Sequence, residues 1–224
     1  MSSTKTKLIE AEKIAEQLFN TIEERKLVKP GKSEKQLNEE VFALAKELFG
    51  IEKFWHKRIV RSGPNTLAPY NDNPPDLIIQ DDDILFFDFG PIIEEWEADF
   101  GRTYVIGNDP LKHKLKKDIE LAWHESKAWF GKQTKLTCAE YYAYNVELAK
   151  QYGWTYGGPL AGHLIGHFPH EKLEPNNYNL YVHPESNTDM FLPDAAGNKR
   201  EWILEIHFVD KEKQIGGFFE QLLT

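Results

Sequence analysis

Amphipathic helical patterns recur along this 224-residue chain. Between residues 5 and 27, apolar residues recur at helical spacing, which predicts a helix with one buried face and one charged face. Ser33 and Gln36 then form a capping-box pattern that opens a second helix, and Gly50 ends it. A strand is expected near residues 56–61, ahead of a loop rich in proline and asparagine.

The second half of the chain repeats this order of elements. A helix begins at residues 108–110 and runs to about Trp129. A second capping box at residues 137–140 opens another helix, which ends at Gly153. This echo predicts an internal duplication of helix, helix and antiparallel strands.

The stretch from residue 84 to residue 106 carries two acidic residues in apolar, aromatic surroundings. Strand formers on both sides of a polar segment predict a hairpin. If its midpoint falls between Ile93 and Glu94, Asp88 and Asp99 face each other with Cβ atoms roughly 5 Å apart. Two ionised, half-buried carboxylates at that distance repel each other, so a shared proton, a basic partner or a metal ion must compensate them.

A matching hairpin is expected in the second half of the chain. Residues 201–208 and 214–222 flank a polar turn, and a pairing centre in that turn brings Glu205 opposite Glu220. A bulge at residues 216–217 is the alternative, and it would shift this register. Each hairpin is therefore expected to present one pair of carboxylates.

Composition restricts the class of protein. With 41% hydrophobic residues, the chain can bury a sizeable core, and we expect one domain over residues 1–224 with halves of about 1–107 and 108–224. The net charge of −9, with basic residues scattered among acidic ones, argues against nucleic acid or a membrane as the main partner. A single cysteine, Cys138, excludes an intramolecular disulfide, and charged residues near the start exclude a signal-peptide core. These features predict a cytoplasmic protein.

The loop between the two predicted hairpins supplies imidazoles. Residues 162–171 contain glycines, which allow close backbone approach, and the three histidines His163, His167 and His170. We interpret His167 as a surface residue. Four converging carboxylates together with imidazole form a ligand set that suits two divalent ions such as Mn, Co, Zn or Fe.

These residues resemble the metal ligands of the superfamily that contains methionine aminopeptidase, Xaa-Pro aminopeptidase, prolidase and creatinase. The resemblance covers nearly the whole chain and rests on Asp88, Asp99, His163, Glu205 and Glu220, in that order. Its local motifs are Asp99-x-x-Arg102-Thr103, Gly162-His163-x-Ile165-Gly166, His170-Glu171 and the turn Lys29-Pro30-Gly31. It implies the α+β "pita-bread" fold, in which duplicated halves with pseudo-twofold symmetry surround a curved antiparallel sheet.

The resemblance implies a role for each metal ligand. Asp88 would bind one ion, and Asp99 and Glu220 would bridge it to a second ion. His163 and Glu205 would complete the coordination of that second ion. Glu205 would also accept a proton from a water that the two ions share.

Two positions depart from the family pattern. Tyr70 stands where these enzymes place another active-site histidine, and no histidine lies between His56 and His113. The usual proline after the first ligand Glu is missing, and His207 points to the same face as Glu205 because strand side chains alternate. Tyr70 and His207 are therefore further candidates for the catalytic machinery, beside His170, which the resemblance assigns to stabilising the developing oxyanion.

The implied activity is hydrolysis of the N-terminal amide bond of a peptide, either Xaa-Pro aminopeptidase-like or methionine aminopeptidase-like. Two alternatives stay open: a creatinase-type hydrolase of the C–N bond in a small amide, and a binding protein that kept the fold and lost catalysis. The sequence also leaves open the physiological metal, the preferred first residue of the substrate and the oligomeric state, with a homodimer as one option.

Overall fold

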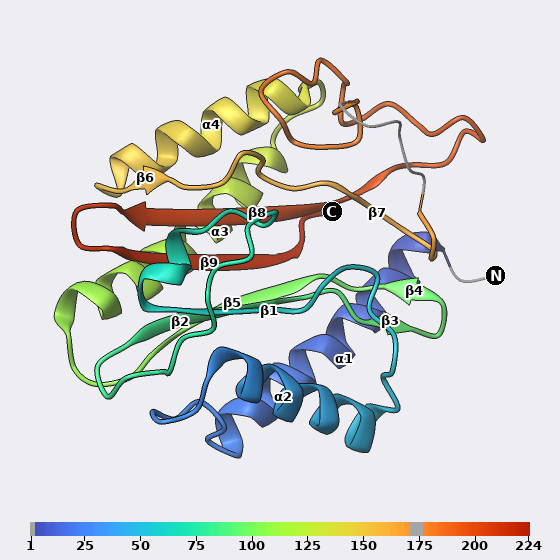
Figure 1. Ribbon diagram of the computed structural model, residues 1–224. Coiled ribbons are helices and arrows are strands. Elements are labelled where there is room, and N and C mark those ends of the chain that lie inside the picture. The colour runs from blue at the N-terminus through green and yellow to red at the C-terminus, as the bar shows by residue number, and fades with distance from the viewer. Residues whose placement is uncertain (1–2, 171–176) are drawn as a thin grey trace.

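Figure 1 shows the computed structural model of the protein, which describes residues 3–170 and 177–224. The helices are α1 (Thr4–Glu24), α2 (Glu34–Phe49), α3 (Pro110–Phe130) and α4 (Cys138–Gln151). Both predicted capping boxes are present, with Ser33 at the start of α2 and Thr137 at the start of α4. The helix predictions are thereby confirmed. A search of the described residues finds no helix with the length and hydropathy that a membrane crossing requires.

Within the described residues, seven strands form one antiparallel sheet at the centre of the molecule. Their order is β1 (Ile59–Ser62), β2 (Ile84–Phe89), β5 (Phe100–Val105), β9 (Ile215–Leu222), β8 (Glu201–Asp210) and β6 (Thr155–Tyr156), with β7 (Leu164–Ile165) also paired to β8. A separate two-stranded ribbon consists of β3 (Ile92–Ile93) and β4 (Trp96–Glu97), and a short 3₁₀ helix, η1 (Gly63–Leu67), follows β1. The hairpins of the two halves therefore meet where β5 pairs with β9, and the α+β class is confirmed.

The first hairpin does not have the predicted register. Glu94 and Glu95 both have positive φ angles, 48° and 69°, and form the tight turn between β3 and β4. The midpoint therefore lies between these two residues, one position later than expected. As a result, Asp88 pairs with Gly101 and not with Asp99. The sequence lacks the Asn-Gly or Asp-Gly pair that usually marks such a turn.

The second hairpin has the predicted register. Glu205 on β8 pairs directly with Glu220 on β9. Residues 216–217 continue the same regular ladder, so the alternative with a bulge at this position is wrong.

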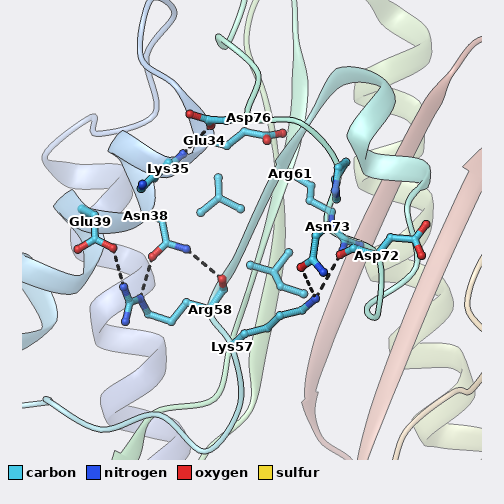
Figure 2. Close-up of a pocket in the computed structure, with 13 residues that line it drawn as sticks. Glu34, Lys35, Asn38, Glu39, Lys57, Arg58, Arg61, Asp72, Asn73 and Asp76 are labelled. Atoms are coloured by element: carbon cyan, nitrogen blue, oxygen red, sulfur yellow. Dashed lines mark hydrogen bonds and ion pairs between the residues drawn. The ribbon is translucent and has the colours of Figure 1, made fainter.

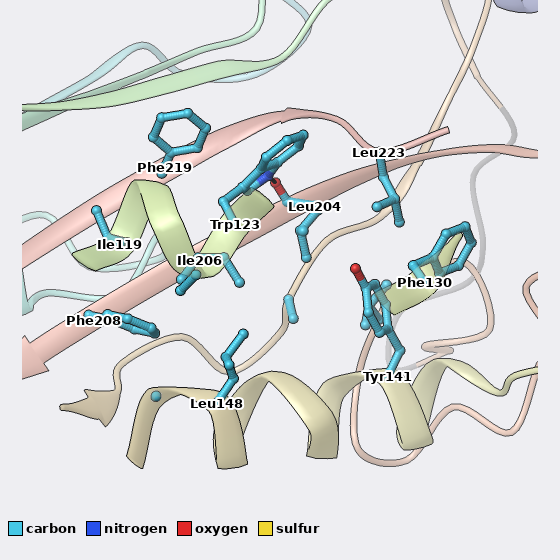
Figure 3. Close-up of a cluster of buried hydrophobic side chains, with 14 of the residues drawn as sticks. Ile119, Trp123, Phe130, Tyr141, Leu148, Leu204, Ile206, Phe208, Phe219 and Leu223 are labelled. Carbon is cyan, nitrogen blue, oxygen red and sulfur yellow. Dashed lines mark hydrogen bonds between the residues drawn. The ribbon is translucent and has the colours of Figure 1, made fainter. Parts of the chain in front are cut away.

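Each half of the chain has its own hydrophobic core. Helices α1 and α2 lie along the part of the sheet that contains β2 and β5 (Figure 1). In the core between them, the Phe19 ring contacts the Phe87 ring edge-on at a centroid distance of 6.0 Å. Helices α3 and α4 pack against β8 and β9. There Trp123 is fully buried, and its Nε1 donates to the carbonyl oxygen of Leu204 at 2.9 Å (Figure 3). Burial of these aromatic side chains stabilises the helix-covered side of the sheet.

Candidate metal centre

Strand alternation directs the acidic side chains to the face of the sheet opposite the two cores. On β2, Asp88 stands between Phe87 and Phe89, which are buried against the helices, so Asp88 points the other way. The same alternation directs Glu205 on β8 and Glu220 on β9 to this face. Leu204 and Ile206, on either side of Glu205, and Phe219, just before Glu220, belong to the second core.

Three of the four carboxylates lie in one row across the central strands. Asp88 on β2 pairs with Gly101 on β5, and Gly101 pairs in turn with Glu220 on β9. Glu220 also faces Glu205 on β8. Asp99 lies two residues before Gly101 and therefore faces the same side. The structure thus brings all four predicted carboxylates together, although Asp88 and Asp99 are diagonal neighbours instead of a facing pair.

Asp99 lies at the centre of the cluster, and each of its carboxylate oxygens meets an imidazole. His163 Nε2 is 3.0 Å from Asp99 Oδ2 and 3.7 Å from Glu205 Oε1. His56 Nε2 is 3.1 Å from Asp99 Oδ1 and 3.5 Å from Asp88 Oδ1. The sequence predicted the position of His163 in this cluster and missed that of His56.

The segment around His163 runs beside β8. The backbone N–H of Ile203 donates to the His163 carbonyl at 2.9 Å, and that of Glu205 donates to the Ala161 carbonyl at 3.2 Å. His163 Nδ1 lies 2.8 Å from the carbonyl oxygen of Leu164 and donates to it. This bond selects the tautomer and directs Nε2 at the carboxylates, as is usual for a metal-binding histidine.

Burial and charge shift the pKa values of this cluster in different directions. Burial raises the pKa of Asp88 to about 6 and that of Glu205 to about 8, and it also raises the pKa of Glu220. Burial opposes ionisation of Asp99 too, but the charges and hydrogen bonds of the two imidazoles outweigh it and lower the pKa of Asp99. The pKa of each imidazole rises to about 9 because the carboxylates outweigh its burial. The site therefore holds more carboxylates than it can ionise without further positive charge.

Glu220 gives the most direct sign that a cation belongs in this cluster. Its Oε2 is buried and has no hydrogen-bond partner among the described residues. A buried carboxylate oxygen without a partner is costly unless a cation approaches it. Ligand atoms of Asp99, His163 and Glu220 lie within 4.8 Å of one another, and so do those of His56, Asp88 and Asp99. The residues present therefore fit divalent metal ions.

His170 lies beside His163, with nearly parallel rings and a centroid distance of 6.4 Å. Its Nδ1 is 2.6 Å from Oε2 of the buried Glu97, and its backbone N–H donates to Glu97 Oε1 at 3.2 Å. These contacts with Glu97 hold the imidazole in place through Nδ1 and the backbone. The Nε2 atom takes no part in them. The sequence did not single out Glu97. Its contacts with the loop that carries His170 distinguish it from the nearby acidic residues, and they are visible only in the structure. Glu171 of the predicted motif lies outside the described residues.

Tyr70 and His207 lie in different surroundings. Tyr70 is 42% exposed, and its ring centroid is 5.9 Å from that of His56. His207 is buried, and its Nε2 donates to the carbonyl oxygen of Thr66 at 2.8 Å. Burial lowers the pKa of His207 to about 4, so its imidazole is neutral at pH 7. Tyr70 thus lies at the rim beside His56, whereas the Nε2 of His207 is occupied by the backbone.

Trp55 forms a wall of the site that the sequence analysis did not identify. Its ring centroid lies 4.4 Å from that of His56, 5.1 Å from that of His163 and 5.4 Å from that of His170. The indole Nε1 donates to the carbonyl oxygen of Ala98 at 3.0 Å, which ties this wall to the segment before Asp99. The only available signal was its position next to His56 in the chain.

The sequence model of metallopeptidase family M24 matches residues 6–195, which is most of the chain. The chain belongs to metallopeptidase family M24. The matched range contains Asp88, Asp99 and His163, and the two glutamates of the cluster follow it. A comparison with curated proteins finds no match.

Solved structures of a prolidase, an Xaa-Pro dipeptidase and a methionine aminopeptidase share the fold. A prolidase from Thermococcus sibiricus matches with a TM-score of 0.76 and 21% identity, over 99% of this chain and 58% of that one. An Xaa-Pro dipeptidase from Bacillus anthracis matches with a TM-score of 0.77 and 21% identity, over 100% of this chain and 61% of that one. A methionine aminopeptidase from Rickettsia prowazekii matches with a TM-score of 0.68 and 14% identity, over 99% of this chain and 96% of that one. The pita-bread fold is confirmed, and the chain spans about three-fifths of the length of the first two proteins.

Proposed function

We propose that this M24 chain is an aminopeptidase that uses two metal ions. The observation that carries the proposal is the convergence of four carboxylates and His163 on one face of the sheet, with Asp99 at the centre. The partnerless Oε2 of Glu220 supports a cation there. Two ions, and not one, follow from the number of carboxylates and from the two groups of ligand atoms that share Asp99.

Each ligand has a place in this proposal. Asp88 would hold one ion, and His163 with Glu205 would hold the other. Asp99 and Glu220 would bind both ions, because Asp99 belongs to both groups of ligand atoms and Glu220 lies in the row between Asp88 and Glu205.

The chemistry of the reaction would be divided between the ions and two side chains. Two divalent ions supply Lewis acidity and a nucleophilic water at neutral pH. Glu205 would take up a proton from that water, because its carboxylate lies in the cluster beside His163 and opposite Glu220. His170, which Glu97 holds through Nδ1, donates from Nε2 to the substrate carbonyl oxygen as negative charge develops there.

Peptides with a free N-terminus and proline in second position are the first substrates to test. Prolidase and Xaa-Pro dipeptidase structures match this fold with TM-scores of 0.76 and 0.77, against 0.68 for the methionine aminopeptidase. The methionine aminopeptidase is, however, the match of similar length. Met-initiated peptides therefore belong in the same panel.

The test uses the whole chain, stripped of metal with a chelator and reloaded with Mn, Co or Zn. Release of the N-terminal residue from Xaa-Pro and Met-initiated peptides is followed by mass spectrometry. We expect metal-dependent release from a peptide with a free amine and none from its acetylated form. Glu205→Gln should lower the rate by about 10² to 10⁴, the usual contribution of a general base. His167→Ala, on the exposed side of the same loop, is the control.

The outcome distinguishes the alternatives. Cleavage of a small amide such as creatine, without cleavage of any peptide, would favour the creatinase-type hydrolase. Metal binding without cleavage of either substrate would favour the binding protein. Failure to bind any divalent ion would overturn the proposal altogether.

A further inference from the structure

We propose that His56 is a sixth protein ligand of the metal centre and binds the ion on the Asp88 side. The inference rests on the proposed dinuclear site and adds to it one residue that the five-ligand pattern does not contain. Each ion would then have one imidazole and one carboxylate of its own: His56 with Asp88, and His163 with Glu205. The carboxylate of Asp99 stands between the two imidazoles.

The two imidazoles have the same local geometry. His56 Nδ1 lies 2.7 Å from the carbonyl oxygen of Lys57, the next residue, just as His163 Nδ1 lies 2.8 Å from that of Leu164. In both residues this contact engages Nδ1 and turns Nε2 towards the carboxylates. A backbone carbonyl on the far nitrogen is the usual way in which proteins orient a metal-binding histidine. The orientation of His56 is therefore as suitable for metal coordination through Nε2 as that of His163.

Space for the His56 imidazole depends on Gly90. A Cβ atom at this position would lie 2.3 Å from His56 Cδ2 and 2.3 Å from Trp55 Nε1, so any larger residue would displace both rings. The Gly90 carbonyl also accepts a hydrogen bond from the Trp55 backbone N–H at 2.9 Å. Gly90 directly follows the strand that carries Asp88. Because Gly90 has no side chain, the Trp55–His56 segment can pack closely against the backbone there.

The chain on the other side of His56 is equally well held (Figure 2). Next to this segment, residues of α2, β1 and the loop after η1 line a polar pocket, as Figure 2 shows. Its volume is about 540 Å³. Arg58 Nε donates to Asn38 Oδ1 at 2.8 Å, and Asn38 Nδ2 donates back to the Arg58 carbonyl at 3.0 Å. Lys57 Nζ donates to the Asp72 carbonyl at 3.2 Å. The imidazole is therefore fixed by backbone anchors before and after it, with only 7% of its side chain exposed.

The contacts of His56 with Asp88 and Asp99 could also be those of a protonated imidazole paired with two carboxylates. Such an ion pair is incompatible with a divalent ion bound at the same oxygens. Nε2 lies 3.1 Å from Asp99 Oδ1 and 3.5 Å from Asp88 Oδ1, and these oxygens would hold the ion. A protonated imidazole at that distance would repel a divalent cation strongly in so buried a place. Once an ion is bound between these oxygens, the neutral Nε2 is therefore its ligand.

The test separates loss of the ligand nitrogen from loss of the fold. In His56→Asn, the side-chain amide can still donate to the Lys57 carbonyl, but no atom reaches the position of Nε2. In His56→Gln, an amide oxygen can approach that position. His163→Asn is the matched change on the other side of Asp99, and His167→Ala is the surface control. Thermal unfolding of the metal-free variants shows whether each one folds.

The measurements are the zinc content per chain and the number of imidazoles per zinc, from elemental analysis and X-ray absorption. We expect wild type to bind two ions with on average one imidazole each. His56→Asn should lose affinity for one ion by more than the roughly 10- to 100-fold that an outer hydrogen-bonding partner is worth. The ion that remains should keep its imidazole from His163, and His56→Gln should retain part of the lost affinity.

Three results would count against the inference in different ways. If folded His56→Asn binds two ions as tightly as wild type, with the same average number of imidazoles, His56 is not a ligand and the dinuclear proposal stands. If wild type binds two ions but shows on average only half an imidazole per zinc, the inference also falls alone. If wild type binds fewer than two ions, the dinuclear site and the role of His56 fall together.

Discussion

The two halves of the molecule use the same elements but present their carboxylates differently. In the C-terminal half, Glu205 and Glu220 face each other directly across β8 and β9. In the N-terminal half, Asp88 faces Gly101, and the contacts on either side place Gly90 opposite Asp99. A carboxylate that faces a glycine leaves room beside it, and in this half an imidazole from outside the sheet fills that room. The duplication thus yields one facing pair and one diagonal pair.

This difference explains how the halves would share the proposed metal centre. The facing glutamates need only one imidazole from the neighbouring loop, His163, which lies beside β8. The diagonal pair of aspartates is in contact with both halves. Asp99 contacts His56 from the N-terminal half and His163 from the C-terminal half. Within this cluster, Asp99 is therefore the carboxylate that contacts imidazoles of both halves.

The largest effect is expected from Asp99→Asn, because Asp99 contacts imidazoles of both halves. The change removes the negative charge that both imidazoles face, and we expect both metal ions and all metal-dependent hydrolysis to be lost. Elemental analysis of reloaded protein measures the ions, with the exposed Asp81→Asn as the control. Retention of two ions per chain would show that Asp99 is not shared between the sites.

His207 has an imidazole whose pKa is lowered mainly by burial, and its effect on stability should appear at acidic pH. Burial lowers its pKa from 6.5 to about 4, so the unfolded chain binds this proton more readily than the folded one. Its contribution to stability should therefore be complete above about pH 6.5 and be lost as the pH falls towards 4, by at most about 3 kcal/mol. Urea unfolding of metal-free wild type and His207→Gln between pH 4 and pH 7 measures it. An equal acid loss in both proteins, or a change in the metal content of the variant, would contradict this structural role.

Gly101→Ala tests whether the glycine of the first hairpin is needed. A Cβ atom there would lie 2.5 Å from the Phe218 ring and 3.1 Å from Glu220 Cβ, on the face of the metal centre. We expect a loss of about 1–3 kcal/mol in the free energy of unfolding, as is typical of overpacking, together with weaker metal binding. Gly131→Ala, where the nearest atom is 3.5 Å away, is the matched control. Equal stability of the two variants would show that the row tolerates a side chain.

Glu12 should give the smallest effect, at a contact between the halves. This α1 residue accepts a hydrogen bond from the backbone N–H of Leu222 on β9, and burial raises its pKa from 4.5 to about 6. The folded chain therefore holds this proton more tightly, and its contribution declines as the pH rises from 4.5 to about 6. Glu12→Gln keeps the acceptor oxygen and should stabilise the protein at pH 7 by at most about 2 kcal/mol. A flat difference between the two unfolding curves across this pH range would contradict the raised pKa.

Local physical rules were sufficient for the helices and the second hairpin. A capping box acts within four residues, so Ser33 and Thr137 marked the starts of α2 and α4 without knowledge of the fold. The regular apolar pattern on both sides of one polar turn was likewise enough to pair Glu205 with Glu220. The four carboxylates and His163 were identified through their order along the chain, and the fold brings them together.

Tertiary structure alone decided the register of the first hairpin and the place of His56. Glu94 and Glu95 adopt positive φ angles that are unusual for glutamate, because the pairing on both sides holds them there. His56 is 43 positions from Asp99 in the chain, and it meets that carboxylate only because residues 53–55 bond to residues 90–92. No local pattern encodes such a contact. It depends on the summed packing of segments that are distant in sequence, and a change in the packing of any of them would move the imidazole away from Asp99.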